Sequence, residues 1–587
     1  MSSRHFGKSL TLAVVFAASA LAAPAPLVPR NNLGWVSPEY NWIFQYPLPI
    51  PPIKTTTTTW TNSSTGAVID FYEISIQSFQ QQIYPNLPKT NLIGYDGMSP
   101  GPTFEMQKGI EAVVRFSNNS PRETSVHVHG QYSRSPFDGW AADTSEPGQY
   151  KDYYYPNGQS ARTLWYHDHA EFITAENAYD GEIGFYIIND SEEGSFGLPS
   201  GNYDIPLALS SKQYDNNGQL VFNTNDNTGL WGDIIHVNGQ PWPYLRVEPR
   251  KYRLRLLDAS VSRTYVLYFE TDNESDISFN VVASDGGFLT HPVETSTLSL
   301  AMGERYEIVF DFSSFSGKNV TLKNTLGVGQ NIDYAATDKV MQFVVGNSVS
   351  SNNNNGNLPS TLRAVPFPPN KIEADKDFVF ARVGDEWKIN GVGFADVNAR
   401  ILTKPPRGAV EIWNLQNGAG DGVHPVHIHL IDFEILARNG DNGTVLPYEA
   451  AGLKDVVYLG PGQSVQVIAR YAPWDGVYMF HCHNLVHEDH DMLVGFNVTS
   501  LAKWGYPPST HFINPMEPEF APRAITTSDF TQSAIEQKLA WFYSTDAYDY
   551  GEEDAVESAL EAYWSTATNG GYAAATTAAA TATQAAS

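Results

Sequence analysis

Short runs of apolar residues recur along the whole chain, and in several of them apolar and polar residues alternate. Residues 112–116, 252–256 and 464–468 are examples. Turn-forming residues flank these runs, and the 587-residue chain contains 46 Gly and 37 Pro. Alternation with a period of two is typical of strands that bury one face, so the pattern predicts repeated β-sandwiches.

A diverged internal repeat accompanies this pattern. An Asp-Gly or Asn-Gly pair precedes an alternating run at three places, and its glycines are Gly97, Gly239 and Gly391. Neighbouring glycines are about 150 residues apart, which is a typical length for one domain. The chain is therefore predicted to contain three consecutive sandwich domains.

The repeat sets the expected boundaries of the segments. We expect a signal peptide at residues 1–22, a lead or propeptide at 23–59, domains at 60–190, 200–345 and 371–515, a linker at 346–370, and a tail at 516–587. The tail is acidic and then rich in Ala and Thr. Within it we expect a short helix at 535–543 and disorder over 573–587, because a polar low-complexity sequence cannot build a core.

The N-terminus has the features of a secretory signal peptide. Arg4 and Lys8 precede an apolar run at 10–21, and Ala-Leu-Ala follows at 20–22 as a cleavage signal. No other run reaches the roughly 18 apolar residues of a membrane span, so we expect no membrane partner. Seven Asn-x-Ser/Thr sites indicate a secreted glycoprotein, extracellular or associated with the cell wall. They are Asn62, Asn118, Asn189, Asn273, Asn319, Asn442 and Asn497.

Charge and cysteine content narrow the function further. Lys and Arg number 36 and Asp and Glu number 64, which gives a net charge of −28. Because nucleic-acid binding needs a basic surface, that class of partner is excluded. The chain has 15 His but only one Cys, Cys482. This excludes an intrachain disulfide framework and any zinc site built from several cysteines, and it leaves one thiolate with a specific role.

Most of the histidines fall in four clusters. The clusters are His127 and His129; His167 and His169; His424, His427 and His429; and His481, Cys482, His483 and His487, followed by Met492. Side chains on a strand alternate between its two faces. Each His-x-His motif therefore points two imidazoles to one side, and Cys482 points to the side opposite His481 and His483. One strand is expected to serve two metal sites.

The residue types identify the metal. The four His-x-His pairs supply eight imidazoles, which suit a polynuclear copper cluster with open positions for dioxygen. His424, Cys482, His487 and Met492 remain, and a trigonal His₂Cys set with a weak axial Met is the blue-copper ligand set. Asp168 stands in the first domain where Cys482 stands in the third. We therefore expect the cluster between domains one and three and the blue site within domain three. The second domain has neither, and we expect its lone histidines to be structural.

These motifs resemble the multicopper oxidases, which include laccases, ascorbate oxidase and bilirubin oxidase. The resemblance covers residues 60–515, rests on residues 137–140, 152–156, 160–169 and 481–492, and is strongest to fungal bilirubin oxidase and laccase-like phenol oxidases. It implies an all-β chain of three cupredoxin-like Greek-key β-sandwiches with four copper ions. The implied ligands are His424, Cys482, His487 and Met492 for type 1 copper, His127 and His427 for type 2, and His129, His167, His169, His429, His481 and His483 for the type 3 pair.

The resemblance also implies a mechanism. Substrate is oxidised one electron at a time at type 1 copper, and electrons pass along Cys482 to a cluster that reduces dioxygen to water. Asp138 and Glu488 match the carboxylates that relatives place near the cluster, where they could relay protons. The expected partners are dioxygen and a small aromatic reducing substrate, and we expect a monomer.

The substrate stays open at this point. Phenols, aminophenols or pigment precursors come first, and tetrapyrroles are the alternative. The chain has Gly422 where bilirubin oxidase has tryptophan, two positions before the first type 1 histidine. Because groups beside a ligand tune its orientation and potential, this departure weighs against bilirubin specificity. A metal-ion oxidase, with Asp421 and Asp432 forming an acidic entry, and a copper-binding coat or wall protein are further alternatives.

Overall fold

The computed structural model describes residues 33–548, apart from residues 224–227, 276, 330, 419–421, 441–442 and 500–511. The expected signal peptide, the sequon at Asn442 and the low-complexity end of the tail lie outside these residues. Strands predominate, which confirms the all-β fold class. The α-helices of the described residues are α1 (Thr174–Asp180), α2 (Pro447–Ala450), α3 (Leu485–Asp489) and α4 (Gln532–Ser544).

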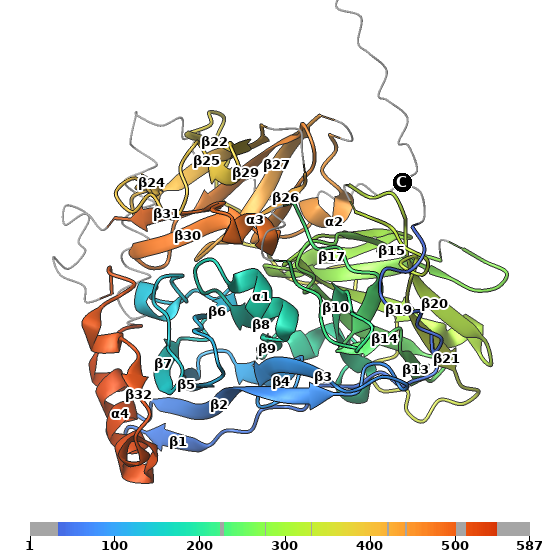
Figure 1. Cartoon of the computed structure of the whole chain (residues 1–587), viewed down its shortest axis with the longest axis horizontal. Coiled ribbons are helices and arrows are strands. Elements are labelled where there is room, and N and C mark those ends of the chain that lie inside the picture. The colour runs from blue at the N-terminus through green and yellow to red at the C-terminus, as the bar shows by residue number, and fades with distance from the viewer. Residues whose placement is uncertain are drawn as a thin grey trace, which may run out of the picture.

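The first domain consists of two sheets, coloured blue to cyan in Figure 1 except for the C-terminal strand β32, which is red-orange. One sheet has the order β1 (Thr58–Thr61), β2 (Val68–Gln81), β5 (Glu111–Asn119), β7 (Gln149–Tyr155) and β32 (Arg523–Ala524), with β3 (Thr90–Tyr95) also paired to β2. The other has the order β4 (Gly101–Gln107), β9 (Ile183–Asn189), β8 (Arg162–Asp168) and β6 (Val126–His129). The second of these sheets carries both histidine motifs of the domain.

The second domain, green in Figure 1, is a larger pair of sheets. One sheet has the order β12 (Gln240–Pro241), β11 (Ile234–Val237), β10 (Asp204–Lys212), β14 (Lys251–Asp258), β19 (Arg305–Asp311), β16 (Phe279–Ser284) and β17 (Gly287–Thr295). The other has the order β13 (Tyr244–Val247), β21 (Lys339–Val345), β20 (Asn319–Asn324), β15 (Tyr265–Glu270) and β18 (Leu298–Leu300).

The third domain, yellow to orange in Figure 1, lies above the other two in that view. One sheet has the order β23 (Glu386–Ile389), β22 (Lys376–Val383), β25 (Val410–Asn417), β29 (Ser464–Arg470) and β27 (Phe433–Asn439). The other has the order β24 (Ile401–Thr403), β31 (Leu493–Val498), β30 (Gly476–Cys482), β26 (His424–Ile428) and β28 (Val456–Leu459). The adjacent strands β26 and β30 carry the histidine motifs of this domain.

The buried cores explain why the alternating runs form strands. Buried and more exposed residues alternate along β2 and β25, so each strand contributes one face to a core. One continuous buried cluster joins the first and third domains and contains Phe71, Tyr166, Trp413 and Phe480. A second cluster fills the second domain and takes in Tyr40 from the N-terminal segment. Domains one and three are therefore packed as one unit around the histidine strands.

The predicted repeat corresponds to one turn that is used three times. Gly97, Gly239 and Gly391 have φ angles of 70°, 78° and 75°. The residue before each glycine also has a positive φ, and these residues are Asp96 (51°), Asn238 (50°) and Asn390 (53°). In every turn its side-chain oxygen accepts a backbone N–H from a neighbouring strand, at 2.8 or 2.9 Å. Two adjacent left-handed residues favour Asn-Gly and Asp-Gly, which makes the repeat visible in the sequence.

The C-terminal segment returns from the third domain to the first. β32 pairs with β7 at the edge of the first sheet, and α4 packs against β1 and β2, at the lower left of Figure 1. Ile535, Leu539 and Phe542 of α4 are buried. The short helix expected at 535–543 is present, and it is anchored to the first domain. None of the described helices has the length and apolar character needed to cross a bilayer.

Candidate metal centres

Two equivalent strand pairs carry the histidine motifs to the boundary between domains one and three. In the first domain, β6 holds His127 and His129, and its pairing with β8 sets His127 opposite His167. In the third domain, β26 pairs with β30 in the same way, and His427 lies opposite His481. Each domain thus presents a matching pair of strand ends to the other.

The eight histidines of these motifs gather into three groups. In each group one ring nitrogen per residue lies within 4.8 Å of the others. The groups are His127, His427 and His429; His129, His167 and His483; and His169, His429 and His481. Every group takes histidines from both domains, so the centre exists only where the two domains pack together.

In three of the imidazoles a hydrogen bond on one ring nitrogen leaves the other nitrogen for a metal. The Nδ1 atoms of His127, His167 and His427 contact the backbone carbonyl oxygens of Asp138, Asp168 and Asp455 at 2.5, 2.7 and 2.8 Å. The Nε2 atoms of the same three rings are buried and have no hydrogen-bond partner among the described residues. Such an outer bond fixes the ring and its tautomer in metal sites. These three rings therefore fit metal ions held by Nε2.

Burial keeps the imidazoles in the form that binds metal. It lowers the pKa of His167 and His424 to about 3 and that of His169 to about 4. A metal binds neutral imidazole, so these rings need lose no proton near pH 7. Imidazole and thiol donors predominate here, although the Asp455 carboxylate also lies within 4.8 Å of ring nitrogens of His129 and His427. Imidazole and thiolate fit copper better than magnesium or calcium.

Asp138 and Glu488, the two predicted carboxylates, lie against the histidine groups from opposite domains. Asp138 Oδ2 is 2.8 Å from His429 Nδ1. Glu488 Oε2 is 2.8 Å from His481 Nδ1, and its Oε1 is 3.5 Å from His169 Nδ1. Burial raises the pKa of Asp138 well above its usual range. Burial acts in the same direction on Glu488, but the neighbouring imidazoles outweigh it and lower its pKa. The pKa values of the two carboxyls are therefore shifted in opposite directions.

Sequence reasoning missed a third carboxylate at this centre, Asp455. Its Oδ1 is 3.1 Å from His129 Nε2, which leaves Nδ1 of that ring without a partner among the described residues. Arg305 of the second domain binds the Asp455 carboxylate at 2.6 and 2.5 Å. No motif marks these residues, because their partners come from different domains. The one available signal was that both are charged residues within or beside apolar runs.

The fourth group lies within the third domain, on the other face of β30. The ring atoms Nδ1 of His424 and His487 are 3.2 Å apart, and they lie 3.4 and 3.7 Å from Cys482 Sγ. Met492 is fully buried beside them, and its backbone bonds to both Cys482 and His487, at 3.1 and 3.0 Å. The structure brings together the two nitrogens and the thiol, while His481 and His483 turn toward the histidine groups.

The surroundings of this group contain a residue that the sequence did not reveal. The Trp387 ring lies 4.1 Å from the His487 ring, centroid to centroid, and 5.4 Å from the His424 ring. His487 Nε2 is 3.0 Å from the carbonyl oxygen of Thr228 in the second domain. Gly422 has a φ of 93°, a conformation that favours glycine. Trp387 covers the face of His487, and the Nε2 edge points toward the second domain.

The structure also shows the contacts of other acidic and histidine residues that the sequence singled out. Asp432, expected as part of an acidic entry near His424, forms an ion pair with Arg162 at 2.7 Å. Asp421, the other residue of that expected entry, lies outside the described residues. His236 bonds to the Tyr214 hydroxyl at 3.0 Å, and His490 Nδ1 lies 2.7 Å from a backbone carbonyl oxygen. Both hold local structure, and neither belongs to a metal-ligand group of the described residues.

Comparison with known proteins agrees with this geometry. Three family models described as multicopper oxidase match residues 78–193, 165–341 and 367–501. The chain is 49% identical to bilirubin oxidase of Albifimbria verrucaria over 90% of this chain and 94% of that one. It is 32% identical to a laccase of Bacillus subtilis over 73% and 94%. The crystal structure of McoA multicopper oxidase from Aquifex aeolicus superposes with a TM-score of 0.68 at 28% identity, over 77% and 99%.

Proposed function

This chain belongs to the multicopper oxidase family, and from that premise we propose that it oxidises small phenolic or related aromatic substrates and reduces dioxygen to water. As a member of the family it is an oxidoreductase that binds copper and uses dioxygen together with a reducing substrate. The phenolic substrate, the count of four copper ions and the roles of single residues are the proposal.

We assign one copper to the group within the third domain and three to the groups between domains. The first would be held by His424, Cys482, His487 and Met492; type 2 copper by His127 and His427; and the type 3 pair by His129, His167, His169, His429, His481 and His483. When bound, copper supplies one-electron oxidation at the first site and four-electron reduction of dioxygen at the others. The observation that carries the proposal is the position of Cys482. Its thiol belongs to the group within the third domain, while its neighbours His481 and His483 belong to groups between the domains.

The residues of the chain supply the rest of the reaction. Cys482 is the covalent bridge for electrons between the two centres. We assign proton delivery to the buried Asp138 carboxyl, whose pKa burial raises and which lies beside His429, and to Glu488, which connects His481 with His169. Reduction of dioxygen consumes protons, and carboxyls in these positions can deliver them as general acids.

Two substrate classes remain in the proposal. Gly422, where bilirubin oxidase has tryptophan, favours phenols, whereas 49% identity to a protein named bilirubin oxidase favours tetrapyrroles. We place phenols first because residue 422 lies next to the proposed type 1 site. Values of kcat/KM for a methoxyphenol and for bilirubin decide between them, and a much higher value for bilirubin would reverse the order. Turnover with neither but with Fe(II) would indicate a metal-ion oxidase, and no turnover a copper-binding wall protein.

The decisive experiment combines copper analysis with spectroscopy. The purified protein is expected to hold four copper ions and to show a thiolate-to-copper band at about 600 nm. Cys482→Ser should lose that band, whereas Met341→Leu, which changes a buried methionine of the second domain, should retain it. A Cys482→Ser protein that stays blue would refute the assignment. We also propose secretion by the predicted signal peptide, which N-terminal sequencing of the exported protein would test.

A further inference from the structure

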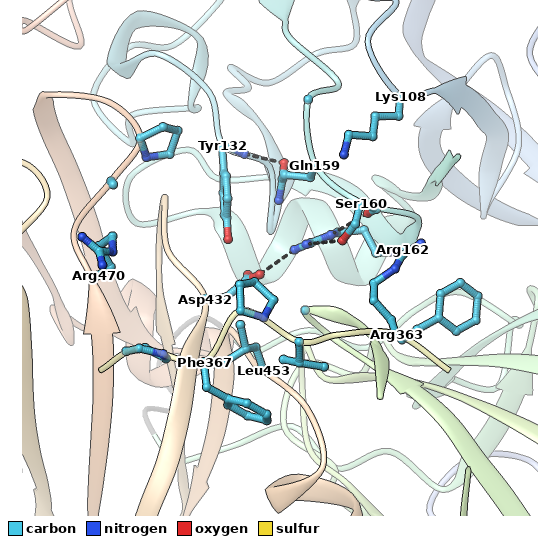
Figure 2. Close-up of a pocket in the computed structure, with 18 of the residues that line it drawn as sticks. Lys108, Tyr132, Gln159, Ser160, Arg162, Arg363, Phe367, Asp432, Leu453 and Arg470 are labelled. Atoms are coloured by element: carbon cyan, nitrogen blue, oxygen red, sulfur yellow. Dashed lines mark hydrogen bonds and ion pairs between the residues drawn. The ribbon is translucent and has the colours of Figure 1, made fainter. Parts of the chain in front are cut away.

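A cavity of about 580 Å³ lies where the three domains meet (Figure 2). Residues 156–162 of the first domain, Phe288 of the second, residues 363–368 between the second and third, and Asp432 and Leu453 of the third contribute to its lining. None of the proposed copper ligands lines it. Its volume lies within the range of pockets that hold small organic ligands.

The polar lining is predominantly basic. Lys108, Arg162, Arg363 and Arg470 line the cavity, and Asp432 is the single acidic residue of its lining. This contrasts with the whole chain, in which acidic residues outnumber basic ones by 64 to 36. A basic concavity in an acidic protein concentrates anions locally, because the field of the lining opposes that of the surrounding surface.

Ion pairs neutralise part of this charge and leave part available. Arg162 binds Asp432 at 2.7 Å. Arg363 binds Asp190 at 2.7 Å and Glu192 at 2.9 Å, but its buried Nη1 has no hydrogen-bond partner among the described residues.

Lys108 supplies charge at the exposed rim. Its ammonium group makes no ion pair with any residue that the structure describes. A ligand anion would therefore meet one free ammonium at the rim and one unsatisfied guanidinium donor inside.

The remaining wall is apolar and aromatic. Phe288, Phe367 and Leu453 face the cavity with Val365 and several prolines. The Arg363 guanidinium lies 5.3 Å from the centre of the Phe288 ring, which places the cation beside an aromatic face. Figure 2 shows the Tyr132 hydroxyl pointing toward the Arg162–Asp432 pair. The cavity thus combines apolar and aromatic lining residues with cationic groups.

A larger cavity elsewhere in the molecule lacks this combination of an apolar lining with available cationic groups. It has a volume of about 790 Å³ and is lined by Arg253 and Arg255. Both are saturated, since Arg253 binds Glu193 at 2.6 Å and Arg255 binds Asp204 at 2.7 Å and Glu307 at 2.9 Å. Its guanidinium groups are already engaged, so it lacks the cationic donors available in the first cavity.

We propose that the cavity between the three domains binds an aromatic carboxylate, with the ring against Phe288 and Phe367 and the carboxylate on Lys108 and Arg363. Hydrogen bonds to a charged donor are stronger than neutral ones, and a carboxylate can accept from both groups. The ring would replace water against the apolar wall. This site is separate from the proposed copper centres, and its existence does not depend on which substrate the enzyme oxidises.

Binding of 2-naphthoate to the purified holoenzyme, measured by calorimetry, tests the proposal, and the uncharged 2-naphthalenemethanol is the matched ligand. We expect saturable binding of the anion and at least tenfold weaker binding of the alcohol. Phe367→Ala should weaken anion binding about tenfold, and Lys108→Gln about threefold because that residue is exposed. Lys318→Gln, which removes an exposed charge from the second domain, should leave the affinity unchanged.

The result has clear contrary outcomes. Equal affinity for the acid and the alcohol would refute recognition of charge. Unchanged affinity in both Phe367→Ala and Lys108→Gln would place the ligand elsewhere, and absence of saturation at millimolar 2-naphthoate would remove the site. Arg363→Gln should weaken binding about tenfold. Because Arg363 also binds Asp190 and Glu192, the thermal unfolding of the Arg363→Gln protein is measured first. If that protein unfolds at a lower temperature than the wild type, Phe367→Ala and Lys108→Gln alone test the proposal.

Discussion

Arg305 joins all three domains beside the proposed copper cluster, and Arg305→Met tests how much this junction contributes. The residue lies on β19 of the second domain and is fully buried. Its guanidinium donates to the Asp455 carboxylate of the third domain and, at 3.1 Å, to the Thr163 carbonyl of the first. Methionine is shorter than arginine but has a similar volume and no donor, so the change removes these bonds with little loss of volume.

The expected effect follows from the buried carboxylate that is left behind. Removing one partner of a buried ion pair lowers the free energy of unfolding by about 3–5 kcal/mol. The neighbouring Asp285 cannot replace Arg305 as a partner, because its negative charge raises the pKa of Asp455 further. We therefore expect a loss of about 4 kcal/mol near pH 7, and loosened copper binding because His129 contacts the same carboxylate.

The pH dependence has a defined sign. Burial raises the pKa of Asp455 above its unfolded value, and the loss of Arg305 raises it further. Such a group favours the folded state when protonated, and this contribution is lost as the pH rises through the folded pKa. The stability difference between the variant and the wild type should therefore be larger at about pH 8 than at about pH 5.5.

Urea titrations of the copper-free proteins, followed by tryptophan fluorescence, measure this difference. Arg246→Met, at an exposed arginine of β13, is the matched control and should stay within about 0.5 kcal/mol of the wild type. A loss below roughly 1 kcal/mol for Arg305→Met, or a difference that grows toward acid pH, would refute the reasoning.

Three further predictions concern other parts of the molecule. Asp138→Asn should lower steady-state turnover about a hundredfold while anaerobic bleaching of the blue band by substrate keeps its rate; equal losses in both would contradict a role in proton delivery. Leu539→Ala in α4 should lower the free energy of unfolding by about 2–5 kcal/mol, measured by thermal denaturation against the exposed control Glu536→Ala. Gly422→Trp should lower stability by about 1–2 kcal/mol because of its positive φ, and it should raise kcat/KM for bilirubin relative to phenols; an unchanged ratio would contradict a role of residue 422 in substrate choice.

Local signals in the sequence were sufficient for the fold class and for the histidine motifs. The alternation of apolar and polar residues predicted the strands, and the Asn-Gly and Asp-Gly pairs predicted a turn that needs two left-handed residues. His-x-His on a strand fixes the direction of both rings, so the division of β30 between Cys482 on one face and His481 and His483 on the other followed from geometry alone.

Contacts between distant segments gave no such signal. Trp387 lies on β23, about a hundred residues before His487, whose ring it covers. α4 reads as a short isolated helix, yet its apolar residues complete the core beside β1 and β2. In each case the partner is set by tertiary packing, which neither periodicity nor residue type records.

The first domain explains why a single site for electron entry is expected although its strands match those of the third. Asp168 occupies the place of Cys482 in the equivalent strand pair. Its carboxylate accepts a hydrogen bond from the Thr124 hydroxyl at 2.6 Å and from the N–H groups of Ser125 and Ala170 at 3.0 Å. These bonds use the side chain to hold the backbone around the histidine motifs. The first domain therefore keeps imidazoles for the proposed cluster, and the proposed electron route through a thiolate belongs to the third domain, which holds the one cysteine of the chain.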